Sequence, residues 1–156
     1  MKKRIYLLTA LISSVVTTII IKKIFRNSIT ELRDTKIKLE SEEILLNKWL
    51  RNIGEQKSLS EELLRLGYSK IAIYGMGDIA NRIYEQLEKT SVQVVYEIDK
   101  ERDVYSDVEL YIIEDELLPV DAIIVADFMN YENIKNKLKS KTNCEILSIE
   151  DIVLKM

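Results

Sequence analysis

The fold of this chain is decided by residues 70–87, Lys70-Ile71-Ala72-Ile73-Tyr74-Gly75-Met76-Gly77-Asp78-Ile79-Ala80-Asn81-Arg82-Ile83-Tyr84-Glu85-Gln86-Leu87. An apolar run typical of a buried strand comes first, and the spacing that follows is that of an amphipathic helix. Between them, Gly75 permits a tight turn, and Gly77 lets backbone N–H groups approach a phosphate at the helix N-terminus. Ala80 stands where such turns need a small side chain between helix and sheet. The segment therefore predicts a strand, a phosphate-holding turn and a helix.

Strands and helices alternate along the rest of this half of the chain. We expect strands at 70–74, 92–98, 110–113, 121–127 and 144–149, helices at 78–89 and 130–140, and a short helix from residue 150. The runs at 71–74 and 122–126 are continuously apolar, which is typical of parallel strands covered on both faces. The alternation predicts an α/β fold with a doubly wound parallel sheet, Rossmann-like, of about five strands in the order 3-2-1-4-5.

Ligands of such sheets bind beyond the carboxyl ends of the strands, so the glycine turn is the first candidate site. It comprises Gly75, Met76, Gly77 and Asp78. Asp78 could cap the helix, but its negative charge opposes a phosphate at the same place. The alternative is that the glycines serve the turn alone.

Two carboxylates that follow other strands complete the candidate site. Asp99 comes about twenty residues after the glycines, where a carboxylate accepts the ribose hydroxyls of an adenosine, and Glu97 is the second choice. An acid here favours NAD over NADP, although Asp99 also begins a charged run that suits a solvated loop. Asp127 follows the fourth strand, on the nicotinamide or sugar side. For that position we prefer the alternative that Asp127 or Asn130 caps the next helix.

Residue usage restricts the chemistry further. The chain contains no His, the commonest general base and metal ligand, and its single Cys144 is expected to be buried and structural. We therefore expect no catalytic residue and no metal site to be identifiable. Tyr131 and Lys135 match the Tyr-x-x-x-Lys pair of short-chain dehydrogenases, but they fall on the helix after the fourth strand, and we interpret the match as coincidence.

Charge is distributed unevenly along the chain. Residues 1–58 hold 12 Lys and Arg against 6 Asp and Glu, whereas residues 59–156 hold 11 against 20. The acidic half argues against nucleic-acid binding, and the basic half flanks an apolar segment, as at a membrane boundary.

Residues 1–25 are predicted to be a membrane anchor. The uncharged run 5–21, IYLLTALISSVVTTIII, would span roughly 26 Å as a helix, and its neighbours extend it. A cleaved signal peptide is the alternative, but no cleavage site is evident. The larger basic count after residue 21 places the C-terminal domain in the cytosol, with the opposite orientation as the alternative.

Residues 26–56 are predicted to form a helical stalk. Its apolar positions follow spacings of four and three: Phe25, Ile29, Leu32, Leu39, Leu46, Leu50 and Ile53, with Lys36 and Glu43 also in the seam. This pattern favours a coiled coil and hence a homo-oligomer. The alternative, given equal weight, is a helix that packs Leu45, Trp49 and Ile53 on the globular domain.

Residues 57–156 are predicted to form the globular domain. Gly54 is expected to end the stalk helix. Ser58 and Glu61 are expected to form a capping box at the start of a short helix that Gly67 closes.

The runs Gly67–Gly77, Val95–Asp99 and Val120–Val125 resemble the small Rossmann-like NAD(P)-binding domains of bacterial sugar and polysaccharide biosynthesis proteins. Similar domains are fused to nucleotide-sugar dehydratases, methyltransferases and glycosyltransferases of capsule and exopolysaccharide synthesis. The resemblance covers about residues 45–153, and it implies a nucleotide site at Gly75, Gly77, Ala80 and Asp99.

These observations predict a membrane-anchored protein that binds NAD or a nucleotide-sugar. We expect it to be a sensing or accessory subunit with a partner in bacterial envelope polysaccharide synthesis. One alternative is an interaction module with a vestigial site, and another is an enzyme subunit completed by a partner chain.

Overall fold

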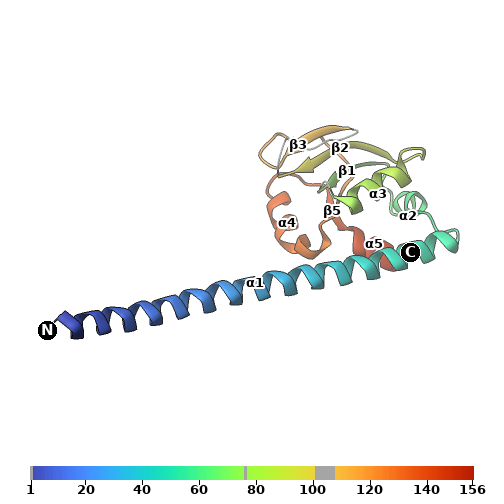
Figure 1. Cartoon of the computed structure of the whole chain (residues 1–156). Helices are drawn as coiled ribbons and strands as arrows, with labels where there is room; N and C mark the ends of the chain where they lie inside the picture. Colours follow the sequence, from blue (N-terminus) through green and yellow to red (C-terminus); the bar gives the residue numbers. More distant parts are fainter. Residues whose placement is uncertain (1, 76, 101–107) are drawn as a thin grey trace. The chain divides into compact units, whose positions relative to one another are not determined.

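The computed structural model describes residues 2–75, 77–100 and 108–156, and along residues 2–16 it describes the helical backbone but not the side chains. The chain divides into two units, Met1–Glu43 and Ile44–Met156. Helix α1 (Lys2–Gly54) forms the first unit and continues into the second (Figure 1). It ends at the predicted glycine.

Within the described residues, no helix is long and apolar enough to cross a membrane. Residues 5–16 of the predicted span lie outside the part of the chain whose side chains are described, and residues 17–25 are exposed. The anchor therefore remains a prediction from the sequence.

The compact second unit is an α/β domain. Its further elements are α2 (Leu59–Arg65), β1 (Lys70–Tyr74), α3 (Asp78–Leu87), β2 (Gln93–Asp99), β3 (Glu109–Ile112), β4 (Ala122–Val125), the 3-10 helix η1 (Phe128–Asn130), α4 (Tyr131–Leu138), β5 (Glu145–Ser148) and α5 (Ile149–Lys155). The sheet has five parallel strands in the order β3-β2-β1-β4-β5. This confirms the predicted fold class and strand order. Four elements, α3, β4, α4 and β5, are shorter than predicted.

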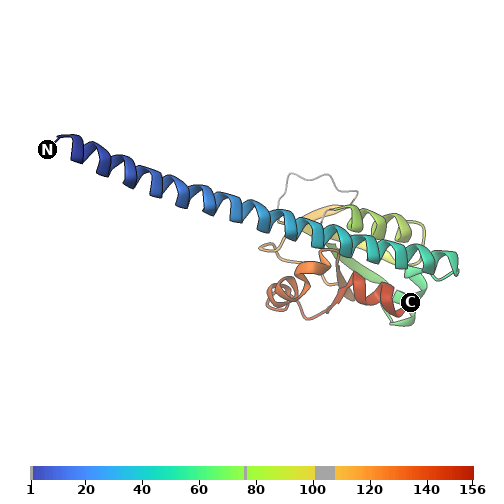
Figure 2. The ribbon, with the colours of Figure 1, turned by 60° about the horizontal axis from the view of Figure 1, so that its bottom comes forward.

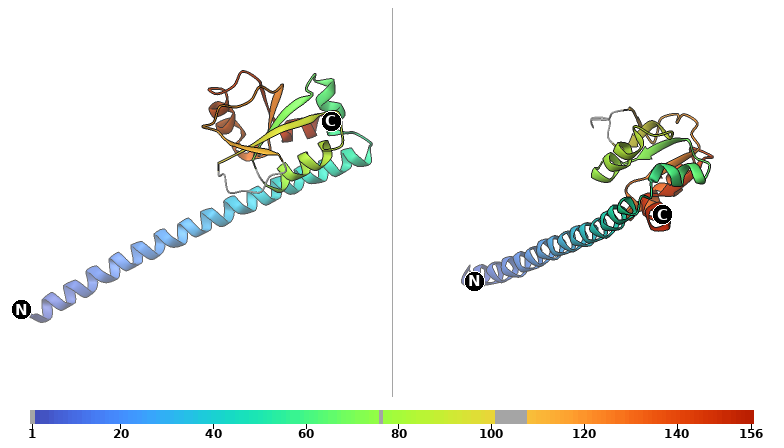
Figure 3. Two further views of the ribbon diagram at one scale, coloured as in Figure 1. Left: turned by 90° about the horizontal axis from the view of Figure 1, so that it is seen from above. Right: turned by 90° about the vertical axis from the view of Figure 1, so that its right-hand side faces the viewer.

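Two apolar layers cover the sheet. On one face, Ile71 and Ile73 of β1 pack with residues of α2, α3, α5 and the end of α1. On the other, Ala72 and Tyr74 pack with residues of α4. Figures 2 and 3 show α3 and α4 on opposite faces. Burial on both faces explains why β1 and β4 read as continuous apolar runs.

The last turns of α1 belong to this core. Leu45 and Trp49 are 2% and 3% exposed, and the Trp49 Nε1 donates to Gln86 Oε1 at 3.1 Å. Asn52 Nδ2 donates to the Val153 carbonyl at 2.7 Å. The packing interpretation of this segment is confirmed for Leu45 and Trp49. It is wrong for Ile53, which is 46% exposed.

The connection from α1 to β1 follows the prediction in part. Gly67 closes α2 with φ +90°, and the Tyr68 N–H donates to the Leu63 carbonyl at 2.9 Å. The predicted capping box is wrong. Ser58 occupies the N-cap position without a side-chain capping bond, because its hydroxyl pairs with the Ser60 hydroxyl at 2.7 Å.

Candidate functional site

The turn after β1 lies where the strand order reverses. The Gly75 N–H donates to the Ile98 carbonyl of β2 at 2.8 Å, and the Ala126 N–H donates to the Tyr74 carbonyl at 2.9 Å. The carboxyl end of β1 is thus held from both sides. In open α/β sheets, this reversal point is where ligands bind.

The two glycines of the turn differ in what the fold demands of them. Gly75 has φ +102°, a conformation that other residues rarely adopt. Gly77 has φ −118° and ψ −176°, which any residue can adopt, and a Cβ there would meet nothing within 4 Å. Gly75 is therefore needed for the turn, whereas the fold gives no reason for glycine at 77. Met76 lies outside the described residues.

Among the described residues, no side chain caps the N-terminus of α3. Gly77 is its N-cap and provides no side-chain bond, and the first N–H bonded within the helix is that of Asn81, to the Gly77 carbonyl at 3.0 Å. Asp78 is exposed in the first turn, and Ala80 is fully buried against the sheet. The small side chain predicted at position 80 therefore has a packing reason.

The two candidate acids of β2 have different environments. Glu97 is 3% exposed and lies opposite Ile73 in the register with β1. Asp99 is half-buried at the end of the strand, and its Oδ1 accepts the Lys100 N–H at 2.6 Å. Asp99 is thus the carboxylate of β2 that a ligand at the sheet edge can reach.

Asp127 follows β4 by two residues and is held by a side chain. Asn130 Nδ2 donates to the two carboxylate oxygens at 3.1 and 2.9 Å. Both residues occupy N-cap positions, Asp127 of η1 and Asn130 of α4, without a side-chain capping bond. The preferred capping interpretation is therefore wrong, because the two side chains bind each other instead.

Tyr74 is a site residue that the sequence reasoning missed. It ends β1 and is 4% exposed, and its hydroxyl makes no hydrogen bond to any described residue. Burial, and then the negative charges of Asp99, Asp127 and Glu114, raises its pKa. The available signal was its place as the last residue of an apolar strand, directly before Gly75.

The structure supports a structural role for the Tyr131–Lys135 pair. The Tyr131 hydroxyl donates to the Ile146 carbonyl at 2.7 Å, and Lys135 Nζ lies 4.9 Å from the Tyr131 ring centroid. The hydrogen bond with Tyr131 raises the pKa of Lys135. Both residues lie on α4, and the Tyr131 hydroxyl ties this helix to β5.

Two further features lie away from the turn. Cys144 is half-buried rather than buried, and its Sγ lies 3.2 Å from Thr142 Oγ1. A pocket of about 200 Å³ lies between the C-terminal half of α3, including Tyr84 and Leu87, and the start of β2. Because that is the amino-end half of β2, the pocket is separate from the glycine turn.

Comparison with known proteins identifies a family. A family model described as C2185-like, N-terminal, matches residues 67–147, just over half of the chain. The chain therefore belongs to this family. The matched region runs from Gly67, just before β1, into β5, and it includes the glycine turn. No curated protein and no solved structure matches the chain.

Proposed function

We propose that this member of the C2185-like family binds a nucleotide, NAD or a nucleotide-sugar, at the carboxyl edge of its sheet. The proposed role is a sensing or accessory one. The observation that carries the proposal is Gly77. Neither its backbone conformation nor the space around it requires glycine, so close approach of a ligand to the backbone supplies the missing reason.

In this proposal, the phosphates lie at the N-terminus of α3. Its first N–H groups have no side-chain cap, and the helix dipole favours a negative charge there. Asp78 opposes that charge from the first turn. A ligand must therefore gain most of its affinity from groups other than phosphate.

The ribose is proposed to bind Asp99. This carboxylate ends the strand next to β1, one residue beyond the Tyr74–Ile98 pair of the register. Its Oδ1 is oriented by the Lys100 N–H, and a carboxylate oxygen can accept more than one hydrogen bond. Neighbouring hydroxyls of a ribose are matching donors.

The cellular setting is part of the proposal. The uncharged run 5–21 supports a membrane anchor, and the basic residues after it support a cytoplasmic domain. The resemblance to domains of sugar and polysaccharide biosynthesis supports a partner in bacterial envelope polysaccharide synthesis. The domain would then report nucleotide supply to that partner.

The test is thermal stability of the full chain in detergent with NAD, NADP, UDP-glucose, UDP-N-acetylglucosamine or GDP-mannose. A ligand at about 100 times its dissociation constant adds roughly 2.7 kcal/mol, which raises the melting temperature by several degrees. We expect Gly77→Val and Asp99→Ala to abolish the shift. The control Asp151→Ala, an exposed acid of α5, should retain it. A flat response to every nucleotide would overturn the proposal.

A second proposed role, self-association, is favoured by α1. Large apolar side chains at coiled-coil spacing are exposed along the first unit: Phe25, Ile29, Leu32 and Leu39 are 51–70% exposed. A long helix gains most of its stability from packing such a stripe. A second copy of the chain, paired along these residues, would cover it.

Sedimentation of the full chain in detergent tests this pairing. We expect a dimer or higher oligomer that the double variant Leu32→Ser/Leu39→Ser converts to monomer. Ile37→Ser is the matched control, because Ile37 is 41% exposed but lies off the stripe. A wild-type monomer would exclude the pairing.

A further inference from the structure

The carboxyl edge presents hydrogen-bond acceptors on both sides of β1. Asp99 is the last residue of β2, Glu114 lies two residues after β3, and Asp127 lies two residues after β4. Tyr74 ends the strand between β2 and β4, in register with Ile98 and Val125. All three carboxylates therefore belong to the edge at which Tyr74 ends its strand, and their negative charges act on its hydroxyl.

The Tyr74 hydroxyl is open to a ligand. Its side chain is 96% buried, since only 4% is exposed, yet the hydroxyl has no hydrogen-bond partner among the described residues. In that part of the structure no fully buried side-chain polar atom lacks a partner, so this hydroxyl must reach the surface. A phenol held rigidly in a core, with its free end at the candidate site, can donate or accept a hydrogen bond.

Asp127 is oriented for the same task. Asn130 binds both of its carboxylate oxygens and fixes the plane of the group. Each oxygen retains room for a further donor. Fixed orientation lowers the entropy cost of binding a ligand.

The chemistry of these groups selects among occupants. Carboxylates repel phosphate, and no three acidic or Cys side chains among the described residues are placed to hold a metal ion. A nicotinamide ring offers only its carboxamide as a hydrogen-bond donor, whereas this edge offers several acceptors. Sugar hydroxyls are donors that suit carboxylates, and they can also pair with a phenol.

We infer that the ligand is a nucleotide-sugar whose sugar hydroxyls bind Tyr74 and Asp127, while its phosphates lie at Gly77 and the N-terminus of α3 and its ribose lies at Asp99. This inference rests on the proposed nucleotide site and names the ligand class. It places the sugar on the β4 side of the point where the strand order reverses.

Isothermal titration of the full chain in detergent tests the inference. The probes are UDP-glucose, UDP-N-acetylglucosamine and GDP-mannose, each compared with UDP or GDP, and NAD. We expect at least one nucleotide-sugar to bind about tenfold more tightly than its nucleoside diphosphate. Tyr74→Phe and Asp127→Asn should each weaken that nucleotide-sugar about fivefold, as loss of one hydrogen bond predicts, and leave UDP and GDP unchanged.

Tyr96→Phe is the matched control. Tyr96 lies on the same face of the sheet, but its hydroxyl already donates to the Leu118 carbonyl at 2.9 Å. Its removal should leave nucleotide-sugar affinity unchanged.

The outcomes separate the two proposals. Equal affinity for each nucleotide-sugar and its nucleoside diphosphate would overturn this inference and leave the nucleotide site standing. The same holds if Tyr74→Phe weakens UDP or NAD as much as the nucleotide-sugar. Absence of binding by every probe would overturn both proposals.

Discussion

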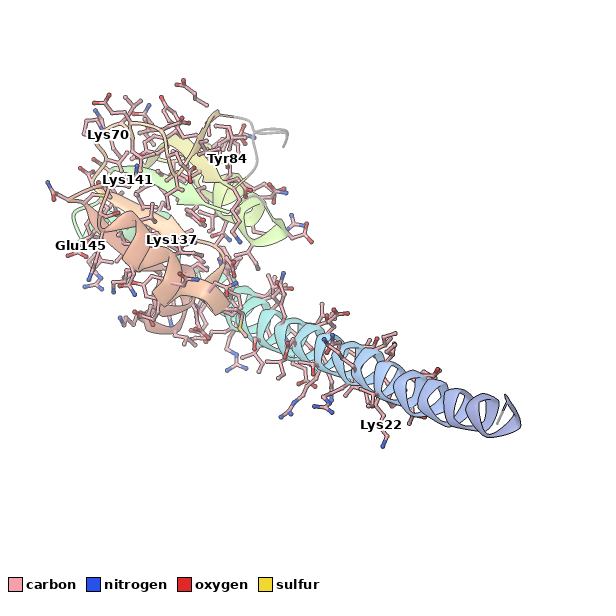
Figure 4. The ribbon with its side chains drawn as sticks, turned by 90° about the vertical axis from the view of Figure 1, so that its left-hand side faces the viewer. Lys22, Lys70, Tyr84, Lys137, Lys141 and Glu145 are labelled. Carbon is pink, nitrogen blue, oxygen red and sulfur yellow. The ribbon has the colours of Figure 1, made fainter. Side chains whose placement is uncertain are left out.

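The two edges of the sheet differ in the hydrogen bonds that their polar groups make. At the amino edge, marked by Lys70 and Glu145 at the starts of β1 and β5 (Figure 4), Asp121 accepts three hydrogen bonds through one carboxylate oxygen. Its Oδ2 accepts the Ser69 and Lys70 N–H groups, both at 2.8 Å, and the Ser69 hydroxyl at 3.1 Å. At the carboxyl edge, the Tyr74 hydroxyl has no partner among the described residues, and the N-terminus of α3 has no side-chain cap.

The difference indicates which edge is a site. Asp121 ties the start of β4 to the start of β1, and its own N–H donates to the Lys70 carbonyl at 2.8 Å. Its hydrogen bonds hold the two strands together. The Tyr74 hydroxyl and the N-terminus of α3 lack such partners among the described residues, and the fold does not require glycine at Gly77. A ligand at the carboxyl edge would explain both features.

The largest expected effect separates the two glycines of the turn. Gly75→Val forces a β-branched residue into φ +102° and should lower the free energy of unfolding by roughly 1–3 kcal/mol. At Gly77 the backbone conformation suits any residue and an added Cβ would meet no atom within 4 Å, so Gly77→Val should cost clearly less. Urea unfolding of the two variants measures the difference. Equal losses would mean that Gly77 is also structural, and the contrast within the carboxyl edge would fail.

The next effect compares two tyrosines on one face of the sheet. Tyr96→Phe leaves the Leu118 carbonyl without its donor and should cost about 1 kcal/mol, whereas Tyr74→Phe breaks no bond to a described residue and should cost little. Thermal unfolding of both variants checks this. A larger loss for Tyr74→Phe would show that its hydroxyl serves the fold.

Tyr96 also predicts a limit of stability at alkaline pH. Burial, followed by the nearby Cys144 and Tyr111, raises the pKa of Tyr96 to about 12. The pKa of Tyr96 in the fold lies above its value of about 10 in the unfolded chain. The free energy of unfolding therefore keeps the full contribution of the neutral Tyr96 below a pH of about 10, and it loses this contribution as the pH rises through about 12. Over this pH range, the free energy of unfolding should fall more steeply with pH for the wild type than for Tyr96→Phe.

The smallest effect concerns the amino edge. The backbone N–H groups of Lys70 and Ser69 lower the pKa of Asp121. Because the pKa of Asp121 is lowered in the fold, its carboxylate stabilises the folded chain at pH values above the usual carboxyl pKa of about 4. This stabilisation is lost as the pH falls through the pKa of Asp121 in the fold. Asp121→Asn should therefore be less stable than wild type near neutral pH, with a gap that closes in acid. Urea unfolding at a series of pH values measures this difference in the free energy of unfolding. A difference that stays constant with pH would contradict the role of the Asp121 carboxylate in joining β1 and β4.

Much of the fold could be predicted from local patterns. The apolar runs at β1 and β4 required cover on both faces, and the alternation with helices then fixed a parallel sheet in the observed order. The candidate site could be located for the same reason, because parallel strands bring their carboxyl ends to one edge. Gly75 was identified because few residues tolerate its φ.

Other features depended on contacts between distant residues. Leu45 and Leu50 are both apolar residues of α1, yet only Leu45 faces the core. Glu97 and Asp99 are both acids of β2, and only burial distinguishes them. Asp127 was expected to interact with backbone, but Asn130 holds it instead.

The sequence by itself determined the α/β class, the strand order, the glycine turn and the position of Asp99, because these follow from periodicity and backbone geometry within short segments. Only the tertiary structure decided that the end of α1 belongs to the core and that the Tyr74 hydroxyl lies at the carboxyl edge without a hydrogen-bond partner among the described residues. The physical reason is that burial and hydrogen-bond satisfaction are properties of a whole packed neighbourhood, which no single segment contains.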